Sequence, residues 1–425
     1  MKLKDRMIIL LISLGFIVVS QAESPAIASE LLTLDDYISY AVLNNTELAA
    51  SFEEYKAALE ETPQARALDD PMFTYGYVAR QSDMQMNQMM GIMQTFPWLG
   101  TIEARTDTAS ARANAARKRF EAAKLKILQQ VKDNFYEYTY LATATEIARE
   151  NLELLTNFEE VARTKYKTAI ASHPDIIRAQ IELASIEDIL KSLEQLREPM
   201  TAKINALLNR PASSELPWPA KEKLVQIHIE RQQIIEMLIN ANPELAELDW
   251  QIEASKSEIE LAKKKFYPNI GVGVEWTGFE RSGESSGRDS IAIMFQMNIP
   301  LWRQSYKAAE QQAKAMARKI EYQKTDSENK IIAQTFNVLY EIDDSRRKFN
   351  LYGQTLIPKS QELVQASESA YRAGTIDFLS LIDSQRMLLQ YKLDYERSIT
   401  NYQQKIAELE MLIGKDLQNP TRFNN

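Results

Sequence analysis

The stretch PNIGVGVEWTGFE, residues 268–280, decides the fold because its side chains alternate with a two-residue period. Ile270 and Val272 point to one side, whereas Gly271 and Gly273 point to the other. Apolar residues alternating with small or polar ones indicate a β-strand with one apolar face and one water-facing side. The surrounding sequence has helical composition, so this strand needs partner strands from elsewhere in the chain.

An internal repeat supplies those partners. The segment NNTELAASFEEYKAALEETPQARALDDP ends at Pro71 and aligns without a gap with ANPELAELDWQIEASKSEIELAKKKFYP, which ends at Pro268. The two halves also finish alike, in ALLNR and MLIGK. Such self-similarity predicts a duplicated structural unit. The predicted division is residues 31–210 for the first repeat, 211–227 for an equatorial linker, 228–415 for the second repeat and 416–425 for a C-terminal tail.

Each repeat contains two alternating stretches of about ten residues, which is the length of a transmembrane β-strand. The predicted strands cover residues 71–81, 88–97, 268–280 and 290–300. Four prolines bracket them, and proline disfavours helix immediately before it and cannot donate a backbone hydrogen bond. These predicted helix–strand junctions are Pro71, Pro97, Pro268 and Pro300.

Long helices account for most of the remaining chain. Residues Thr101 to Ala169 contain no proline and predict a helix of roughly 100 Å. Leu301 to Ala373 repeats that length with interruptions at Gly353 and Pro358. Shorter return helices are expected from Pro174 to Leu208 and from Asp377 to Ile413. Taken alone, these patterns would favour an ordinary coiled coil.

The N-terminus and the composition restrict the class of protein. A basic start and an apolar run from Met7 to Val19 predict a signal peptide over residues 1–22, with cleavage as late as 28. The alternative, an uncleaved anchor, is disfavoured because the run is short for a membrane span. The 425-residue chain has no cysteine, two histidines and a net charge of -9. We therefore expect no catalytic or metal constellation, no cofactor and no nucleic-acid partner.

Four strands of membrane length in an exported protein favour an oligomeric tube. Only helices and closed barrels satisfy the backbone in lipid, and four strands are too few to close a membrane barrel. Several chains must therefore pool their strands into a barrel, and the helices would extend that barrel. The alternative is a periplasmic coiled-coil scaffold or adaptor, against which the membrane-length strands argue.

The whole mature chain resembles the TolC-type outer-membrane efflux family. The resemblance rests on the tandem repeat, the matching strand pairs, the Tyr-x-x-Gly motif at Tyr371 and Gly374, and IDFLSLIDSQRMLL from Ile376. It implies a homotrimer in outer-membrane lipid, with a barrel of twelve strands and a periplasmic helical tunnel. It also implies a passive, non-enzymatic exit duct that works with a periplasmic adaptor (membrane fusion) protein and an inner-membrane efflux pump.

Two stretches resemble the heavy-metal efflux branch of that family: DPMFTYGYV, residues 70–78, and GIMQTFPWLG, residues 91–100. The resemblance makes heavy-metal cations one candidate cargo. Drugs, amphiphiles and secreted polypeptides stay open as alternatives, because a passive duct need not encode its cargo.

The family's narrow periplasmic entrance implies further site residues. Asp383 falls on one position of an aspartate ring, and Ser380 falls where a second carboxylate is expected. Asp175 matches an aspartate that helps to hold the entrance closed, whereas Ile376 replaces an expected arginine. The closing network is therefore only partly present. The adaptor-facing hairpin tips would comprise Tyr166, Lys167, Tyr371, Arg372 and Gly374.

Methionines are concentrated in the first strand pair. The weak candidates for a soft-metal contact there are Met84, Met86, Met89, Met90 and Met93, next to Met72. Thioether sulfur suits Cu(I) and Ag(I). Methionine also fills apolar gaps and suits a lipid-facing surface, and this second interpretation is the favoured one.

Overall fold

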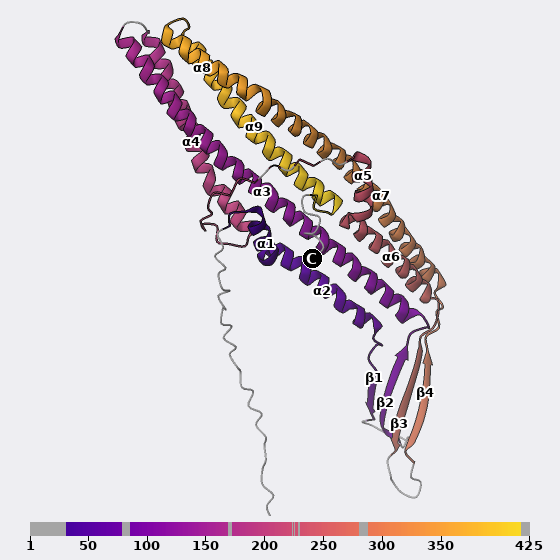
Figure 1. The fold of residues 1–425 in the computed structure, drawn as a ribbon. Coiled ribbons are helices and arrows are strands. Elements are labelled where there is room, and N and C mark those ends of the chain that lie inside the picture. Colours follow the sequence, from indigo (N-terminus) through magenta and orange to yellow (C-terminus); the bar gives the residue numbers. More distant parts are fainter. Residues whose placement is uncertain are drawn as a thin grey trace, which may run out of the picture.

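The computed structural model describes residues 31–78, 86–168, 172–222, 224, 226–227, 230–279 and 288–417. The predicted signal peptide and Met84 lie outside these ranges, and the side chain of Met86 is likewise not described. Helices and strands occupy opposite ends of an elongated molecule, with the sheet beyond one end of the helices (Figure 1).

The helices lie nearly along one direction and pack side by side in Figure 1. In chain order they are α1 (Leu34–Asn44), α2 (Thr46–Arg66), α3 (Thr101–Lys167), α4 (His173–Leu207), α5 (Arg231–Ala241), α6 (Pro243–Lys264), α7 (Arg303–Leu351), a π-helical turn (Tyr352–Leu356), α8 (Ile357–Ala373) and α9 (Phe378–Ile413). None of the helices in the described part of the chain combines the length and the apolar composition needed to cross a membrane.

The internal repeat is visible at the level of single hydrogen bonds. Asn45 begins α2 by accepting a hydrogen bond from the Leu48 amide at 2.9 Å, which satisfies one of the free N–H groups of the first turn. The side-chain amide of Asn45 donates to the Leu207 carbonyl at 2.8 Å. Asn242 caps α6 in the same way and donates to the Leu412 carbonyl at 2.8 Å. In each repeat, this hydrogen bond therefore ties the end of the return helix (α4 or α9) to the start of the helix that precedes the first strand (α2 or α6).

The two long hairpins differ at one point. Helix α3 runs without a break, whereas the second hairpin contains the π-helical turn between α7 and α8. A side chain at Gly353 would begin 2.8 Å from a ring carbon of Tyr395 on α9, so only glycine lets the two helices approach there. Pro358 follows directly after this turn and has no N–H to donate, so the regular helical hydrogen-bond ladder is interrupted there. The predicted interruption of this helix is thus a local widening of the helix.

The four strands form one antiparallel sheet in the order β1–β2–β3–β4. Their bounds are β1 (Met72–Tyr77), β2 (Met86–Phe96), β3 (Ile270–Phe279) and β4 (Ser290–Met297). The register places Met72 opposite Met93, Met93 opposite Gly273, and Gly273 opposite Met294. The central pair, β2 with β3, joins the two repeats, so the repeats share a single sheet.

Three apolar clusters hold the helices together. One packs α1 against α3 around Tyr37 and Phe135, and a second packs α5 and α7 against α9 around Tyr402. The third joins both hairpins near their tips around Phe378. The predicted fold class, long helical hairpins and four strands in a tandem repeat, is confirmed.

Candidate functional site

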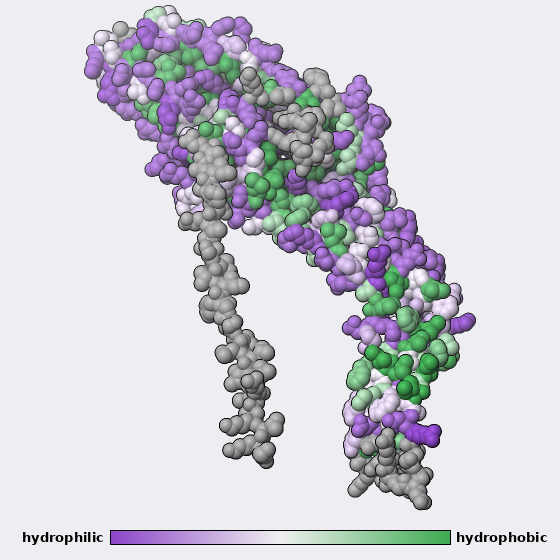
Figure 2. All heavy atoms as spheres, turned by 60° about the horizontal axis from the view of Figure 1, so that its bottom comes forward, coloured by the Kyte–Doolittle hydropathy of each residue, from purple (hydrophilic) through white to green (hydrophobic). Residues whose placement is uncertain are grey.

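The sheet has one face that is almost entirely apolar. The register sets thirteen exposed hydrophobic side chains on this face, with exposed fractions between 37% for Val272 and 78% for Phe295. They are Phe73, Tyr75, Tyr77, Met90, Ile92, Phe96, Ile270, Val272, Val274, Ile291, Ile293, Phe295 and Met297. Figure 2 shows hydrophobic residues gathered at the strand end, whereas hydrophilic residues cover much of the helical part. So large an exposed apolar surface indicates contact with lipid or protein.

The opposite face carries small and polar residues. They are Thr74, Gly76, Gly91, Thr95, Gly271, Gly273, Glu275, Thr277, Ser290, Ala292 and Gln296, with methionines Met72, Met89, Met93 and Met294 among them. Two faces of opposite character along one strand length suit a wall between lipid and water. The four bracketing prolines lie just outside the strands, at the passages between helix and sheet.

The sheet is open at both edges within the described chain. Strands β1 and β4 each pair on one side only, so their outer N–H and C=O groups have no strand partner. Such edges are tolerated in water but not in lipid, where every unsatisfied backbone group costs several kcal/mol. In this chain, β1 and β4 are therefore the edges at which further strands could pair.

Tyr371 is the buried centre of the hairpin tips. Its ring lies 5.3 Å from that of Phe378, and the Lys165 ammonium lies 4.7 Å above it and also donates to the Tyr371 carbonyl. Its hydroxyl has no hydrogen-bond partner among the described residues. Burial, with a smaller contribution from the charge of Asp175, raises the pKa of this hydroxyl to about 12. Tyr371 therefore packs the tip as a neutral side chain.

Tyr166, its counterpart in the first repeat, is 46% exposed and lies 5.6 Å from the ring of His173. Beside it Lys167 is exposed at the end of α3. Arg372 is also exposed and pairs with Glu368 at 2.6 Å. Gly374 ends α8 with φ of 79°, a left-handed conformation that glycine adopts without strain. The two tips therefore present basic side chains but differ in their aromatic packing.

The three entrance residues have different local roles. Asp175 accepts hydrogen bonds from the Ser172 amide at 3.0 Å and the Ser172 hydroxyl at 2.8 Å, so it completes the capping box at the start of α4. Ser380 donates its hydroxyl to Asp377 at 2.6 Å at the start of α9. Asp383 is exposed and lies 3.5 Å from Arg386, which also pairs with Glu182 of the first hairpin. Within one chain, Asp383 is thus partly neutralised.

A buried ion cluster at mid-length was not predicted. The Lys132 ammonium lies 2.5 Å from Glu410 and 3.6 Å from Asp416, and all three side chains are at most 4% exposed. The Leu417 amide donates to the second Glu410 oxygen at 2.9 Å. The cluster joins α3 of the first repeat to the end of α9, which carries Glu410, and to Asp416 in the chain that follows. The sequence could have indicated this cluster, because Lys132 follows Leu128 by four residues and therefore lies on the buried face of α3.

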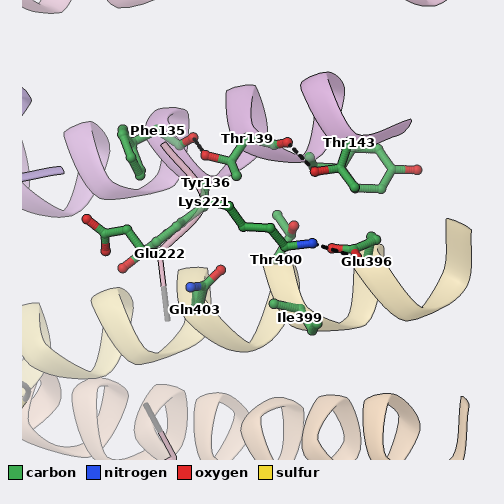
Figure 3. Close-up of a pocket in the computed structure, with 11 residues that line it drawn as sticks. Phe135, Tyr136, Thr139, Thr143, Lys221, Glu222, Glu396, Ile399, Thr400 and Gln403 are labelled. Atoms are coloured by element: carbon green, nitrogen blue, oxygen red, sulfur yellow. Dashed lines mark hydrogen bonds and ion pairs between the residues drawn. The ribbon is translucent and has the colours of Figure 1, made fainter. Parts of the chain in front are cut away.

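The linker between the repeats lies across the same region. Lys221 extends from the linker and pairs with Glu396 of α9 at 2.8 Å, above a small cleft whose walls include Thr139 and Thr400 (Figure 3). Glu222 accepts a hydrogen bond from the Leu34 amide at 3.2 Å, and burial raises the pKa of its carboxyl. These contacts fix the linker against both repeats. Among the described residues no group of three His, Cys, Asp or Glu side chains could hold a metal ion.

Comparisons with known proteins agree with this geometry. The family described as "Outer membrane efflux protein" matches residues 37–210 and 234–415. The cobalt-zinc-cadmium resistance protein CzcC of Cupriavidus metallidurans is 21% identical over 405 residues, which cover 92% of each chain.

Solved structures show the same fold. The outer-membrane protein VceC of Vibrio cholerae superposes with a TM-score of 0.75 at 16% identity, covering 90% of this chain and 96% of VceC. The MtrE outer-membrane channel of Neisseria gonorrhoeae gives 0.75 at 17% identity, covering 92% and 90%. The family match over both repeats shows that the chain belongs to the outer membrane efflux protein family, as a channel with a helical tunnel in the periplasm.

Proposed function

We propose that three copies of this chain pool their strands into one barrel of twelve strands and serve as the passive exit duct of a tripartite efflux pump. The observation that carries this proposal is the open four-stranded sheet with an apolar face. Pairing β4 of one copy with β1 of the next would satisfy both edges, and three copies would close the ring. Family channels form trimers, which supports this number.

The test is the oligomeric state of the protein extracted from the outer membrane in detergent. We expect a trimer by native mass spectrometry and a heat-sensitive trimer band on a denaturing gel. A chain lacking residues 268–300 keeps α1 to α4 but loses β3 and β4, and it should yield no trimer. A monomer that stays in the periplasmic fraction without detergent would contradict the proposal and support a scaffold or adaptor instead.

The hairpin tips are the proposed docking site for a periplasmic adaptor, through which an inner-membrane pump would deliver cargo. Lys167 and Arg372 project exposed positive charge there, which suits polar docking. We expect Lys167→Glu with Arg372→Glu to abolish export while the trimer band persists. Lys330→Glu, a charge reversal at an exposed ion pair along α7, is the matched control and should leave export intact.

Heavy-metal cations are the proposed cargo, and the similarity to CzcC supports this choice. Cells lacking the protein should accumulate one or two metals from a panel of Cu, Ag, Zn, Co and Cd salts, and the intact gene should reverse the effect. Sensitivity to dyes and detergents alone would refute the metal cargo and leave the duct itself standing.

The entrance is proposed to lie where Asp383 of three copies approach a common axis. Three carboxylates near an axis would attract cations and raise each other's pKa. We expect Asp383→Asn to lower the trimer's affinity for divalent cations, with Asp326→Asn, an exposed carboxylate of α7, as the control. Equal affinity in both variants would contradict the ring.

A further inference from the structure

The register of the sheet separates the methionines of the strands into two groups. Met90 and Met297 lie on the apolar face, among its other exposed hydrophobic side chains. Met72, Met93 and Met294 lie on the opposite face and in one row across the sheet, because Met72 pairs with Met93 and both Met93 and Met294 pair with Gly273. Met294 comes from the second repeat, far from the methionine-rich segment.

The strand between Met93 and Met294 has no side chains that would keep them apart. A side-chain carbon at Gly273 would begin 2.7 Å from the Ile92 carbonyl oxygen, so that position admits only glycine. The Met93 sulfur lies 3.2 Å from the place where a Gly271 side chain would begin, so the thioether extends over β3 toward β4. Met294 is the one half-buried residue of β4, and the other seven are exposed.

Packing does not explain these three thioethers. Their neighbours on the same face are Thr74, Gly91, Thr95, Glu275, Ala292 and Gln296, which offer no apolar cluster to complete. Met72 and Met93 are directly opposed, so their Cβ atoms lie about 4.5–5.5 Å apart. Met93 and Met294 lie on either side of β3, two strand spacings or about 9–10 Å apart, a gap that two flexible methionine side chains can span to share a ligand above Gly273. Glu275 adds a negative charge on the same face, one pleat further along β3.

We propose that Met72, Met93 and Met294 form a binding site for a soft monovalent cation, Ag⁺ or Cu⁺. Thioether sulfur is a soft, uncharged donor that prefers such ions over Zn²⁺ or Mg²⁺. Three thioethers without a thiolate bind weakly enough to release the ion, as a wall contact along an export path requires. The role in export rests on the proposed duct, in which this face of the sheet lines the lumen and the sites of three chains form a ring at the tunnel end of the barrel.

The test is Ag⁺ binding to the purified full-length protein in detergent, measured by equilibrium dialysis with metal analysis. The variant Met72→Leu/Met93→Leu/Met294→Leu keeps side-chain volume. The matched control Met90→Leu/Met297→Leu/Met316→Leu replaces three methionines outside the site. We expect the site variant to lose at least ten-fold in Ag⁺ affinity, the control to bind as the wild type does, and Zn²⁺ binding to stay unchanged in both.

Trimer bands on denaturing gels verify folding, and Met294→Leu alone, on the edge strand, is the second variant if the triple variant fails to assemble. Equal Ag⁺ affinity in the wild type and the site variant would overturn the proposal, as would equal losses in site and control variants. Trimer formation separates the two proposals, since a site variant that forms the trimer but binds Ag⁺ as the wild type does would refute the site alone. A wild-type protein that forms no trimer in detergent would count against the duct, while site-specific Ag⁺ binding would still support the site.

Discussion

Removing the ammonium of Lys132 should destabilise the protein more than removing any exposed lysine. Lys132→Met preserves much of the side-chain volume but leaves Glu410 and Asp416 buried without their counter-charge. Breaking a buried ion pair in this way costs about 3–5 kcal/mol. Lys221→Met is the matched control, because the Lys221–Glu396 pair has a lysine that is 59% exposed and should contribute below about 1 kcal/mol.

The same substitution predicts a pH dependence. Burial already raises the pKa of the Glu410 carboxyl, and Lys132 is the main group that holds it down. Without Lys132 that pKa rises further. A carboxyl whose folded pKa exceeds its unfolded value takes up a proton more readily in the folded state, so stability falls as pH rises between the two values. The deficit of Lys132→Met should therefore be larger at pH 8 than at pH 5.

Thermal melts of the detergent-solubilised protein, followed by circular dichroism at one scan rate, would rank the variants. Glu410→Gln in the Lys132→Met background should recover a large part of the lost stability, because it removes the stranded charge. Equal melting temperatures for Lys132→Met and Lys221→Met, or a deficit that does not change with pH, would refute the assignment of this cluster as a buried electrostatic link.

Three further predictions concern the sheet and the tip. Ile293→Lys places a charge on the apolar face and should cost ~2–4 kcal/mol per chain near the membrane midplane, whereas Ala292→Lys should be tolerated; the yield of trimer on denaturing gels distinguishes them. Gly273→Ala should lower that yield, because overpacking against the Ile92 carbonyl costs about 1–3 kcal/mol, and normal yield would contradict the register. Tyr371→Phe should melt no lower than the wild type, since it removes an unpaired hydroxyl. The stability of the wild type should fall between pH 10 and 12, in part because the pKa of Tyr371 is about 12 in the folded protein, and Tyr371→Phe should lack that part of the fall. A melting temperature below that of the wild type would reveal a partner for the hydroxyl.

Much of the fold could be predicted from the sequence because its signals are local. The two-residue period of β3 and β4 needs no partner to be recognised, and the Asn45 and Asn242 caps occupy matching positions in an ungapped repeat. Gly353 and Pro358 likewise mark the interrupted helix through their own backbone properties.

The remaining features depend on contacts between segments that are far apart in the sequence, which the local pattern does not reveal. Strand β2 reads MNQMMGIMQTF and has methionines in both phases of the pleat, so its period alone does not assign Met90 and Met93 to a face. Pairing with the unambiguous β3 decides it. The partners of Lys132 are hundreds of residues away, and a lone lysine on a helix is ordinarily solvated. The repeats also differ beside the two tip tyrosines: Tyr166 lies against His173, whereas the more deeply buried Tyr371 lies against Phe378.

The open edges of the sheet have a genetic consequence. If each ring is completed by three chains, one copy with a defective β4 leaves a gap that two sound copies cannot fill. In a cell that expresses intact and defective chains equally, random mixing leaves about one ring in eight wholly intact. Lesions in β1 or β4 should therefore be dominant over the wild-type gene, whereas lesions that prevent a chain from joining any ring should be recessive.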